Sequence, residues 1–128
     1  MKKPLSAVNV FVIVLSTFFI IEGFWGLFSR VVFGVLTTNP LHAIIHLLLG
    51  STGLYTGLRN HARKFSLYIG VLLIVVGGLY FVPGAHEIFT DLLNVNDAVA
   101  YLNIITGVAA ILFALLTPKK GAVRTTLP

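Results

Sequence analysis

The chain lacks cysteine altogether and contains few charged residues. Without cysteine among its 128 residues, it has no disulfide framework, no thiolate metal site and no thiol nucleophile. Charged residues make up 10% of the chain, against about 25% in an ordinary soluble domain, so they are too few to cover a water-facing surface. Disorder is excluded as well, because disordered chains combine low hydrophobicity with high charge and this chain is 57% hydrophobic.

Four apolar runs approach the roughly 20 residues that a helix needs to cross the hydrocarbon core of a bilayer. They cover residues 5–28, 41–58, 65–85 and 98–117. Helices are expected in spite of the many β-branched residues, because every backbone N–H and C=O must be paired within lipid. The sequence therefore predicts an all-α fold, with a four-helix transmembrane bundle in residues 1–118 and a cytoplasmic tail at 119–128.

The basic residues predict the orientation of these spans. Eight of the nine lysines and arginines fall on the side of the two termini and of the loop between the second and third spans, and Arg30 is the exception. By the positive-inside rule this side is cytoplasmic, which places both termini inside. Short basic clusters beside a membrane are explained by anionic lipid headgroups, so the lipid bilayer rather than nucleic acid is the expected partner.

Two of the runs share a pattern of polar and small residues. Its members are Asn39, His46 and Gly50 in the second run and Asn96, Asn103 and Gly107 in the fourth. The chain therefore resembles a duplicated helical hairpin whose two copies start on the same side of the membrane. Small residues at helical spacing let membrane helices approach closely. The residues expected to pack in this way are Gly50, Gly53, Gly57, Gly107 and Ala110.

Polar side chains on three spans fall at similar depths near the predicted outer end. They are Glu22, His42, His46 and Asn103, with Asn39 at the start of the second span. An ionisable group inside a bilayer costs about 2.5–3.5 kcal/mol or more, so these groups are expected to bind one another. A purely structural cross-link of His46 to Glu22 or Asn103 is the alternative to a functional site. The approach to the cluster is expected to be lined by Trp25, His86, Asp97 and Tyr101.

Three kinds of ligand fit this cluster. His42 and His46, four residues apart, match a transition-metal site together with the carboxylate of Glu22. Histidine and glutamate can also relay a proton, and a His–Glu–Asn cluster near the interface can hold the head of a quinone or lipid. Haem is disfavoured because histidines four residues apart on one helix cannot supply trans axial ligands to one iron. No cofactor is assigned.

No catalytic motif is present, since the chain has no Gly-rich phosphate loop, no H-E-x-x-H and no G-x-S-x-G. The leading interpretation is a non-enzymatic membrane module that binds a small ligand, an ion or a partner. Such a module is expected to form a homo-oligomer or to join a larger membrane complex. The alternatives are a redox or quinone-linked membrane subunit that handles protons, and a small ion or metabolite exporter.

The run Asn39-Pro40-Leu41-His42 followed by His46 and Gly50 resembles the motif of small four-helix bacterial membrane proteins known only as a domain of unknown function. In such proteins the fourth helix often carries a histidine where this chain has Asn103. More distantly, the architecture is similar to that of DoxX-like membrane proteins, some of which are linked to quinone-dependent redox chemistry. The resemblance implies a multi-pass protein of the bacterial inner membrane.

Overall fold

The computed structural model describes residues 4–118, which form five helices and one small β-hairpin. Four helices are long and apolar enough to cross a membrane, namely α1 (Ala7–Gly26), α2 (Pro40–Leu58), α3 (Ala62–Leu79) and α5 (Asp97–Leu116). The other elements are the strands β1 (Val31–Val32) and β2 (Leu36–Thr37) and the short helix α4 (Ala85–Leu93). The predicted all-α class with four spans is confirmed, and the expected tail at 119–128 lies outside the described residues.

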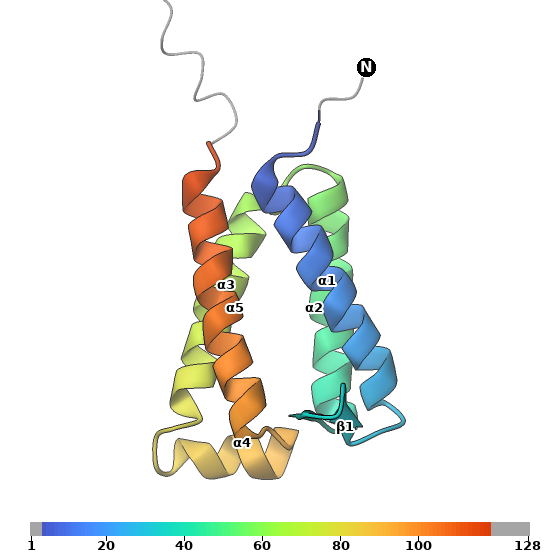
Figure 1. The fold of residues 1–128 in the computed structure, drawn as a ribbon, viewed down its shortest axis with the longest axis vertical. Helices are drawn as coiled ribbons and strands as arrows, with labels where there is room; N and C mark the ends of the chain where they lie inside the picture. The colour runs from blue at the N-terminus through green and yellow to red at the C-terminus, as the bar shows by residue number, and fades with distance from the viewer. Residues whose placement is uncertain (1–3, 119–128) are drawn as a thin grey trace, which may run out of the picture.

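The long helices are arranged as two hairpins. α1 packs mainly along α2, and α3 packs mainly along α5, with smaller contacts between the two pairs (Figure 1). An apolar layer joins the pairs and contains Leu15, Phe19, Ile69, Leu73 and Ala110. The start of α1, the α2–α3 loop and the end of α5 lie together at what we call the basic end, after Arg59, Arg63 and Lys64. The β-hairpin and α4 lie at the opposite end, called the α4 end (Figure 1).

The two hairpins pack in the same way, as the internal repeat predicts. A Cβ added to Gly50 would lie 2.8 Å from the carbonyl oxygen of Ser16, and one added to Gly107 would lie 2.6 Å from that of Gly70. Helix backbones approach this closely only where a side chain is missing. The small residues are therefore buried within each hairpin, which applies to Gly50, Gly53, Gly57, Gly107 and Ala110.

A second pair of glycines gives the correspondence between the hairpins. A Cβ on Gly23 would lie 3.0 Å from the carbonyl oxygen of Ala43, and one on Gly77 would lie 2.8 Å from that of Ala100. Both alanines are fully buried. Together with the first pair, these contacts show that α1 and α2 correspond to α3 and α5 along their length.

Two asparagines tie the hairpins to each other at the α4 end. Asn39 caps α2 with its side-chain oxygen, and its Nδ2 donates to the carbonyl oxygen of Leu92 at 2.8 Å. Asn96 caps α5 in the same manner, and its Nδ2 donates to the carbonyl oxygen of Val35 at 2.9 Å. Each N-cap therefore binds the connecting segment of the other hairpin.

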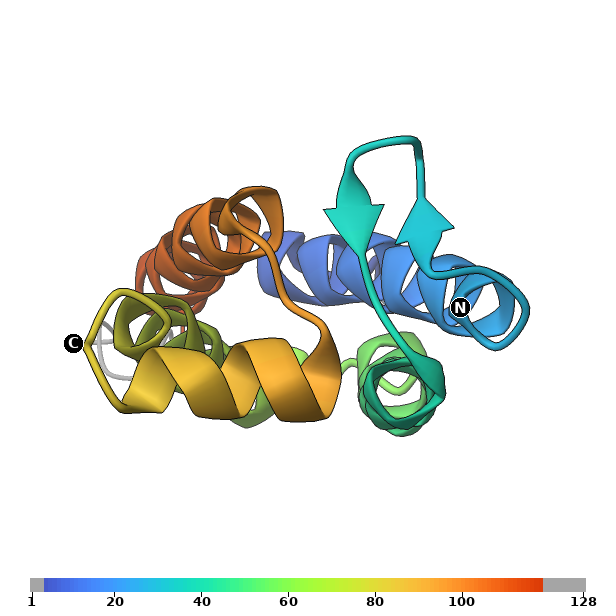
Figure 2. The same ribbon diagram turned by 90° about the horizontal axis from the view of Figure 1, so that it is seen from below.

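The connections at the α4 end are themselves ordered. Residues 29–40, which from sequence could be an extension of the first helix, a loop or an interfacial segment, contain the β-hairpin, whose turn places Phe33 and Gly34 at positive φ. The third predicted span, 65–85, is shorter in the structure, because α3 ends at Leu79. Pro83, which lacks an N–H and disfavours helix at the residue before it, follows in the turn that leads to α4. Helix α4 then lies across this end beside α2 and α3, while the β-hairpin lies on the other side next to α1 (Figure 2).

Candidate functional site

The ion pair of the site joins the two helices of the first hairpin. Glu22 on α1 places its Oε1 2.7 Å from Nδ1 of His46 on α2. Both side chains are about nine-tenths buried, at 9% and 11% exposed. The close approach of the helices at Gly23 and Gly50 brings these two side chains within bonding distance inside the protein. Glu22 therefore faces protein rather than acyl chains.

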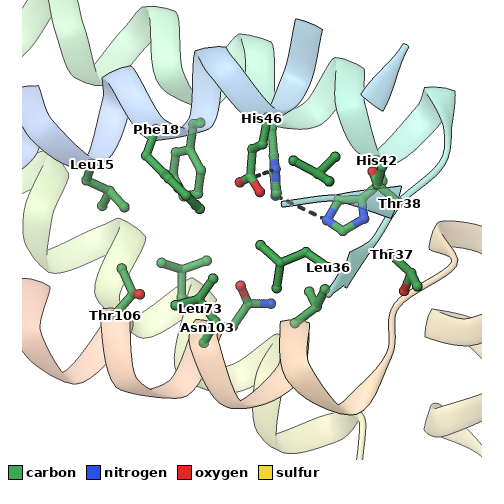
Figure 3. A pocket seen from close by; sticks show the side chains of 15 residues that line it. Leu15, Phe18, Leu36, Thr37, Thr38, His42, His46, Leu73, Asn103 and Thr106 are labelled. Carbon is green, nitrogen blue, oxygen red and sulfur yellow. Dashed lines mark hydrogen bonds and ion pairs between the residues drawn. The ribbon is translucent and has the colours of Figure 1, made fainter. Parts of the chain in front are cut away.

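The pair continues into a chain of hydrogen bonds towards the α4 end. Nε2 of His46 lies 3.1 Å from Nε2 of His42, one helical turn earlier on α2 (Figure 3). Nδ1 of His42 lies 3.1 Å from the carbonyl oxygen of Leu93, the last residue of α4. Glu22, His46, His42 and the Leu93 carbonyl thus form one line from α1 to α4.

Hydrogen-bond chemistry assigns the protons along this line. A carbonyl oxygen only accepts, so Nδ1 of His42 carries the hydrogen and its Nε2 is left as an acceptor. Nε2 of His46 must therefore donate to His42. One further proton lies between Nδ1 of His46 and the carboxyl group of Glu22, on either side of a 2.7 Å contact. In both arrangements the cluster is neutral overall, which lowers the cost of burying it.

A small cavity with polar and apolar walls lies beside the hydrogen-bonded line. Its volume is about 20 Å³, which is room for about one water molecule. Polar side chains in its wall come from α1, α2, α5, strand β2 and the residue after β2, namely Glu22, Thr37, Thr38, His42, His46, Asn103 and Thr106. Oγ1 of Thr37 is buried and has no hydrogen-bond partner among residues 4–118. The side chain of Asn103 extends from α5 towards Leu36 (Figure 3).

A larger cavity of about 200 Å³ lies between the hairpins. Most of its wall is apolar and comes from α2, α3 and α4, including Ile45, Leu49, Leu72, Val76 and Phe89. The polar part of its wall consists of His42, His46 and Asn103, which also line the small cavity. The large cavity therefore combines apolar walls with a polar patch that is connected to Glu22.

The structure brings some of the predicted site residues together and separates others. Glu22, His46 and His42 form the chain, and Asn103 lines both cavities with no hydrogen bond from its side chain within the described part of the protein. Asn39 serves as the cap of α2 rather than as part of either cavity wall. The approach residues lie elsewhere, because neither cavity is lined by Trp25, His86, Asp97 or Tyr101.

The three proposed metal ligands lie in a row rather than around a point. His46 faces Glu22 with Nδ1 and His42 with Nε2, so the three donors do not converge. Within residues 4–118 no group of three histidine, cysteine, aspartate or glutamate side chains is placed to hold a metal ion. The metal site from His42, His46 and Glu22 stays a prediction that this geometry does not support.

The hydrogen-bonded line of Glu22, His46 and His42 is present in only one of the two helical hairpins. Since Gly23 corresponds to Gly77, the position of Glu22 is occupied in the second hairpin by Val76, one residue before the glycine. His46 corresponds in the same way to Asn103, four residues before Gly107. The second hairpin packs as closely as the first without an ion pair. Hairpin packing therefore does not require Glu22 and His46, which points to a role in the site.

Sequence reasoning missed a second polar contact at the α4 end. The hydroxyl of Tyr80, just after α3, donates to Oδ1 of Asp97 at 2.6 Å, and Nδ1 of His86 lies 2.7 Å from the carbonyl oxygen of Tyr80. The hydrogen bond to Asp97 raises the pKa of the Tyr80 phenol to about 12. A tyrosine at the end of an apolar run gives no sequence signal for this contact.

Comparison with known proteins places the chain in a family. No match was found among curated proteins or among solved structures. One family model matches residues 9–116, which include nearly all of the four long helices and every residue of the Glu22–His46–His42 chain. The match also fits a multi-pass membrane protein, as the four apolar helices indicate. The chain belongs to the family described as Domain of unknown function (DUF4383).

Proposed function

We propose that this protein binds the polar head of a small membrane-soluble molecule in the large cavity between its hairpins. The observation that carries the proposal is a cavity with apolar walls and a patch of His42, His46 and Asn103. Ligand sites have this composition, with mostly apolar walls and a few placed polar groups that fix orientation. The volume of about 200 Å³ suits a head of the size of one ring, with any apolar tail left in the lipid.

The polar patch offers both kinds of hydrogen bond to such a head. The amide of Asn103 can donate and accept, and it is not engaged with other described side chains. Both histidines already use both ring nitrogens within the hydrogen-bonded line, so the amide of Asn103 is the group of the patch that is free to bind a ligand. The site is therefore suited to a carbonyl or hydroxyl group on the head of the ligand.

The wall of the cavity supplies a matched pair of variants for the test. Val76 lines the cavity, whereas its neighbour Val75 is 48% exposed on the outer surface of α3. Binding of a benzoquinone with a decyl tail is measured by titration calorimetry on the protein in mild detergent. Val76→Phe is expected to abolish binding by filling the cavity, and Val75→Phe is expected to leave the affinity unchanged. Equal binding by both variants, or no binding of quinone and of the corresponding decylphenol by the unaltered protein, would refute the proposal.

A redox or quinone-linked subunit is the second candidate, and the continuous chain of hydrogen bonds favours it. When an added electron acceptor oxidises a bound quinol, the hydrogen-bonded line could take up one of the released protons at His42 or His46, and the cluster, which is neutral before the transfer, would then carry one positive charge. The distant resemblance to DoxX-like proteins favours the same role. Proton release on oxidation of bound quinol in proteoliposomes, reduced in Glu22→Gln, is the expected result. Unchanged release would contradict this role.

The exporter has less support from the fold. The apolar layer of Leu15, Phe19, Ile69, Leu73 and Ala110 lies between the polar site and the basic end. Proton or ion flux into liposomes that is lost in Glu22→Gln would support the exporter instead.

The helix-packing glycines favour a monomer over the predicted homo-oligomer, because Gly50 and Gly107 are already used inside the hairpins.

The predicted location belongs to the same proposal. We place the α4 end outside and the basic end in the cytoplasm of a bacterial inner membrane, because Arg59, Arg63 and Lys64 lie at the basic end. The site then opens near the external leaflet. Cysteine labelling with a membrane-impermeant maleimide, at Ser29 on one side and at Asn60 on the other, tests this. Labelling of intact cells is expected at the first position alone, and labelling only at the second would reverse the orientation.

A further inference from the structure

The basic end carries positive charge that the chain itself does not neutralise. Its described cations are Arg59, Arg63 and Lys64, and the sequence places five more in the flanking segments, namely Lys2, Lys3, Lys119, Lys120 and Arg124. The four acids of the whole chain all belong to the other half of the spans or to α4, and are Glu22, Glu87, Asp91 and Asp97. No acidic side chain lies at the basic end within residues 4–118, so a counter-charge for the described cations there is expected from another molecule.

A pocket of about 470 Å³ opens among these cations. Its wall is formed by the start of α1, the α2–α3 loop, the first turn of α3 and the residues after α5, and includes Ser6, Asn9, Asn60, Arg63, Lys64 and Thr117. Nε of Arg63 is buried and has no hydrogen-bond partner among residues 4–118. A buried guanidinium N–H without an acceptor is costly, so Arg63, which lines this pocket, has a hydrogen-bonding capacity that the described residues leave unused.

The wall of this pocket is held in place by Asn9. Its Oδ1 accepts from the backbone N–H of Ala62 at 2.9 Å, and its Nδ2 donates to the side-chain oxygens of Ser6 and Asn60. These bonds join the start of α1 to the α2–α3 loop and the first turn of α3. The backbone that carries Arg63 and Lys64 is therefore held in place before a ligand arrives, which reduces the entropy lost on binding.

Arg59 and Arg63, the arginines of the basic end within the described residues, differ in what they contact. The guanidinium carbon of Arg59 lies 5.0 Å from the ring centre of Tyr55, so its charge faces an aromatic ring. Arg63 instead lines the pocket together with Lys64. Arg63 is the residue placed to bind an anion, and Arg59 is a natural control for charge alone.

We propose that this pocket binds a phosphate group, supplied by the headgroup of an anionic phospholipid. Arg63 donates to the phosphate oxygens through its planar fork, and Lys64 adds a second positive charge. The pocket lies at the ends of all four spans, which is the level of the headgroups in a bilayer. Basic pockets between membrane helices recognise anionic headgroups in this way. The site is separate from the cavity at the α4 end and does not depend on its ligand.

Binding of short-chain phosphatidylglycerol to the protein in neutral detergent tests the proposal, with phosphatidylcholine and inorganic phosphate as parallel probes. The unaltered protein is expected to prefer phosphatidylglycerol, and Arg63→Gln is expected to lower its affinity about tenfold, the size of one charge-assisted hydrogen bond. Arg63→Lys, which keeps the charge, is expected to recover part of the loss. Arg59→Gln is expected to change the affinity less than about twofold, since surface charge alone contributes little.

The parallel probes separate the two sources of phosphate. Preference for the lipid over inorganic phosphate assigns the site to a headgroup, whereas equal affinity for both, lost in Arg63→Gln, assigns it to a free phosphate anion. Equal binding of phosphatidylglycerol and phosphatidylcholine would overturn the site. An equal loss in Arg59→Gln and Arg63→Gln would overturn it too, because it would show attraction by charge alone.

Discussion

Replacing the Glu22–His46 pair by the residues of the second hairpin tests whether the pair serves the fold or the site. The variants are Glu22→Val, His46→Asn and their combination, since Val76 and Asn103 occupy the corresponding positions. The second hairpin packs around a valine and an asparagine without an ion pair. The double variant is therefore expected to fold, while each single variant leaves one partner of the pair alone.

The magnitude follows from the geometry of the contact. Glu22→Val leaves Nδ1 of a His46 side chain that is 11% exposed without its partner, and such a loss costs about 1–3 kcal/mol. His46→Asn likewise leaves the carboxyl group of Glu22 without its partner. Coupling energies between polar partners in membrane proteins average about 0.6 kcal/mol and reach about 1.7 kcal/mol. A buried contact of 2.7 Å belongs near the upper end, so we expect a coupling of about 1.5 kcal/mol.

The free energy of unfolding of all four proteins is measured by far-UV circular dichroism in mixed micelles of mild and denaturing detergent. The double variant is expected to be more stable than the sum of the two single losses predicts, by the coupling energy. Additive losses, with a coupling below about 0.3 kcal/mol, would refute the existence of the buried pair. Quinone binding measured on the same double variant is expected to be weakened even where stability is recovered.

Three further predictions concern the packing and the α4 end. Gly107→Ala is expected to destabilise the protein by about 1–3 kcal/mol, because its Cβ would lie 2.6 Å from a backbone oxygen. Gly78→Ala is expected to stabilise the protein by about 0.5–1 kcal/mol, because a Cβ there would have nothing within 4 Å. Thermal unfolding of the two variants measures the difference. Asn39→Ala removes a cap and a bond to the other hairpin, so a loss of at least about 1 kcal/mol is expected by the same measurement. The Tyr80 phenol is expected to ionise near its raised pKa of about 12, and Asp97→Asn is expected to bring it towards 10, as followed by ultraviolet absorbance. Because the folded protein holds that proton more tightly, its contribution to stability is present below pH 10 and is lost as the pH rises towards about 12.

Much of the fold could be predicted from the sequence because lipid imposes strong constraints. The four spans follow from run length, and the corresponding N-caps Asn39 and Asn96 mark the two hairpins. The meeting of Glu22 and His46 follows from depth, since both residues lie a similar distance from the α4 end and neither can face lipid cheaply. These features depend on distances along helices, which the sequence fixes well.

The features that could not be predicted depend on how elements meet in space. His42 binds the Leu93 carbonyl only because α4 folds back over the end of α2, which no local pattern encodes. The line of donors, in place of a metal-like cluster, results from His46 using both ring nitrogens in opposite directions. The β-hairpin needs Phe33 at φ 55°, a conformation that a phenylalanine seldom adopts and that its sequence does not suggest.

Heteronuclear NMR of the imidazole nitrogens tests the central claim most directly, because the proposed chain fixes which nitrogen of each ring carries hydrogen. At neutral pH the account predicts His42 protonated at Nδ1 with a bare Nε2, and His46 protonated at Nε2 with its Nδ1 signal displaced by the proton shared with Glu22. Glu22→Gln is expected to alter the His46 signals and to leave the His42 tautomer in place. A His42 ring protonated at Nε2 would contradict the chain, and with it the site that the chain supports.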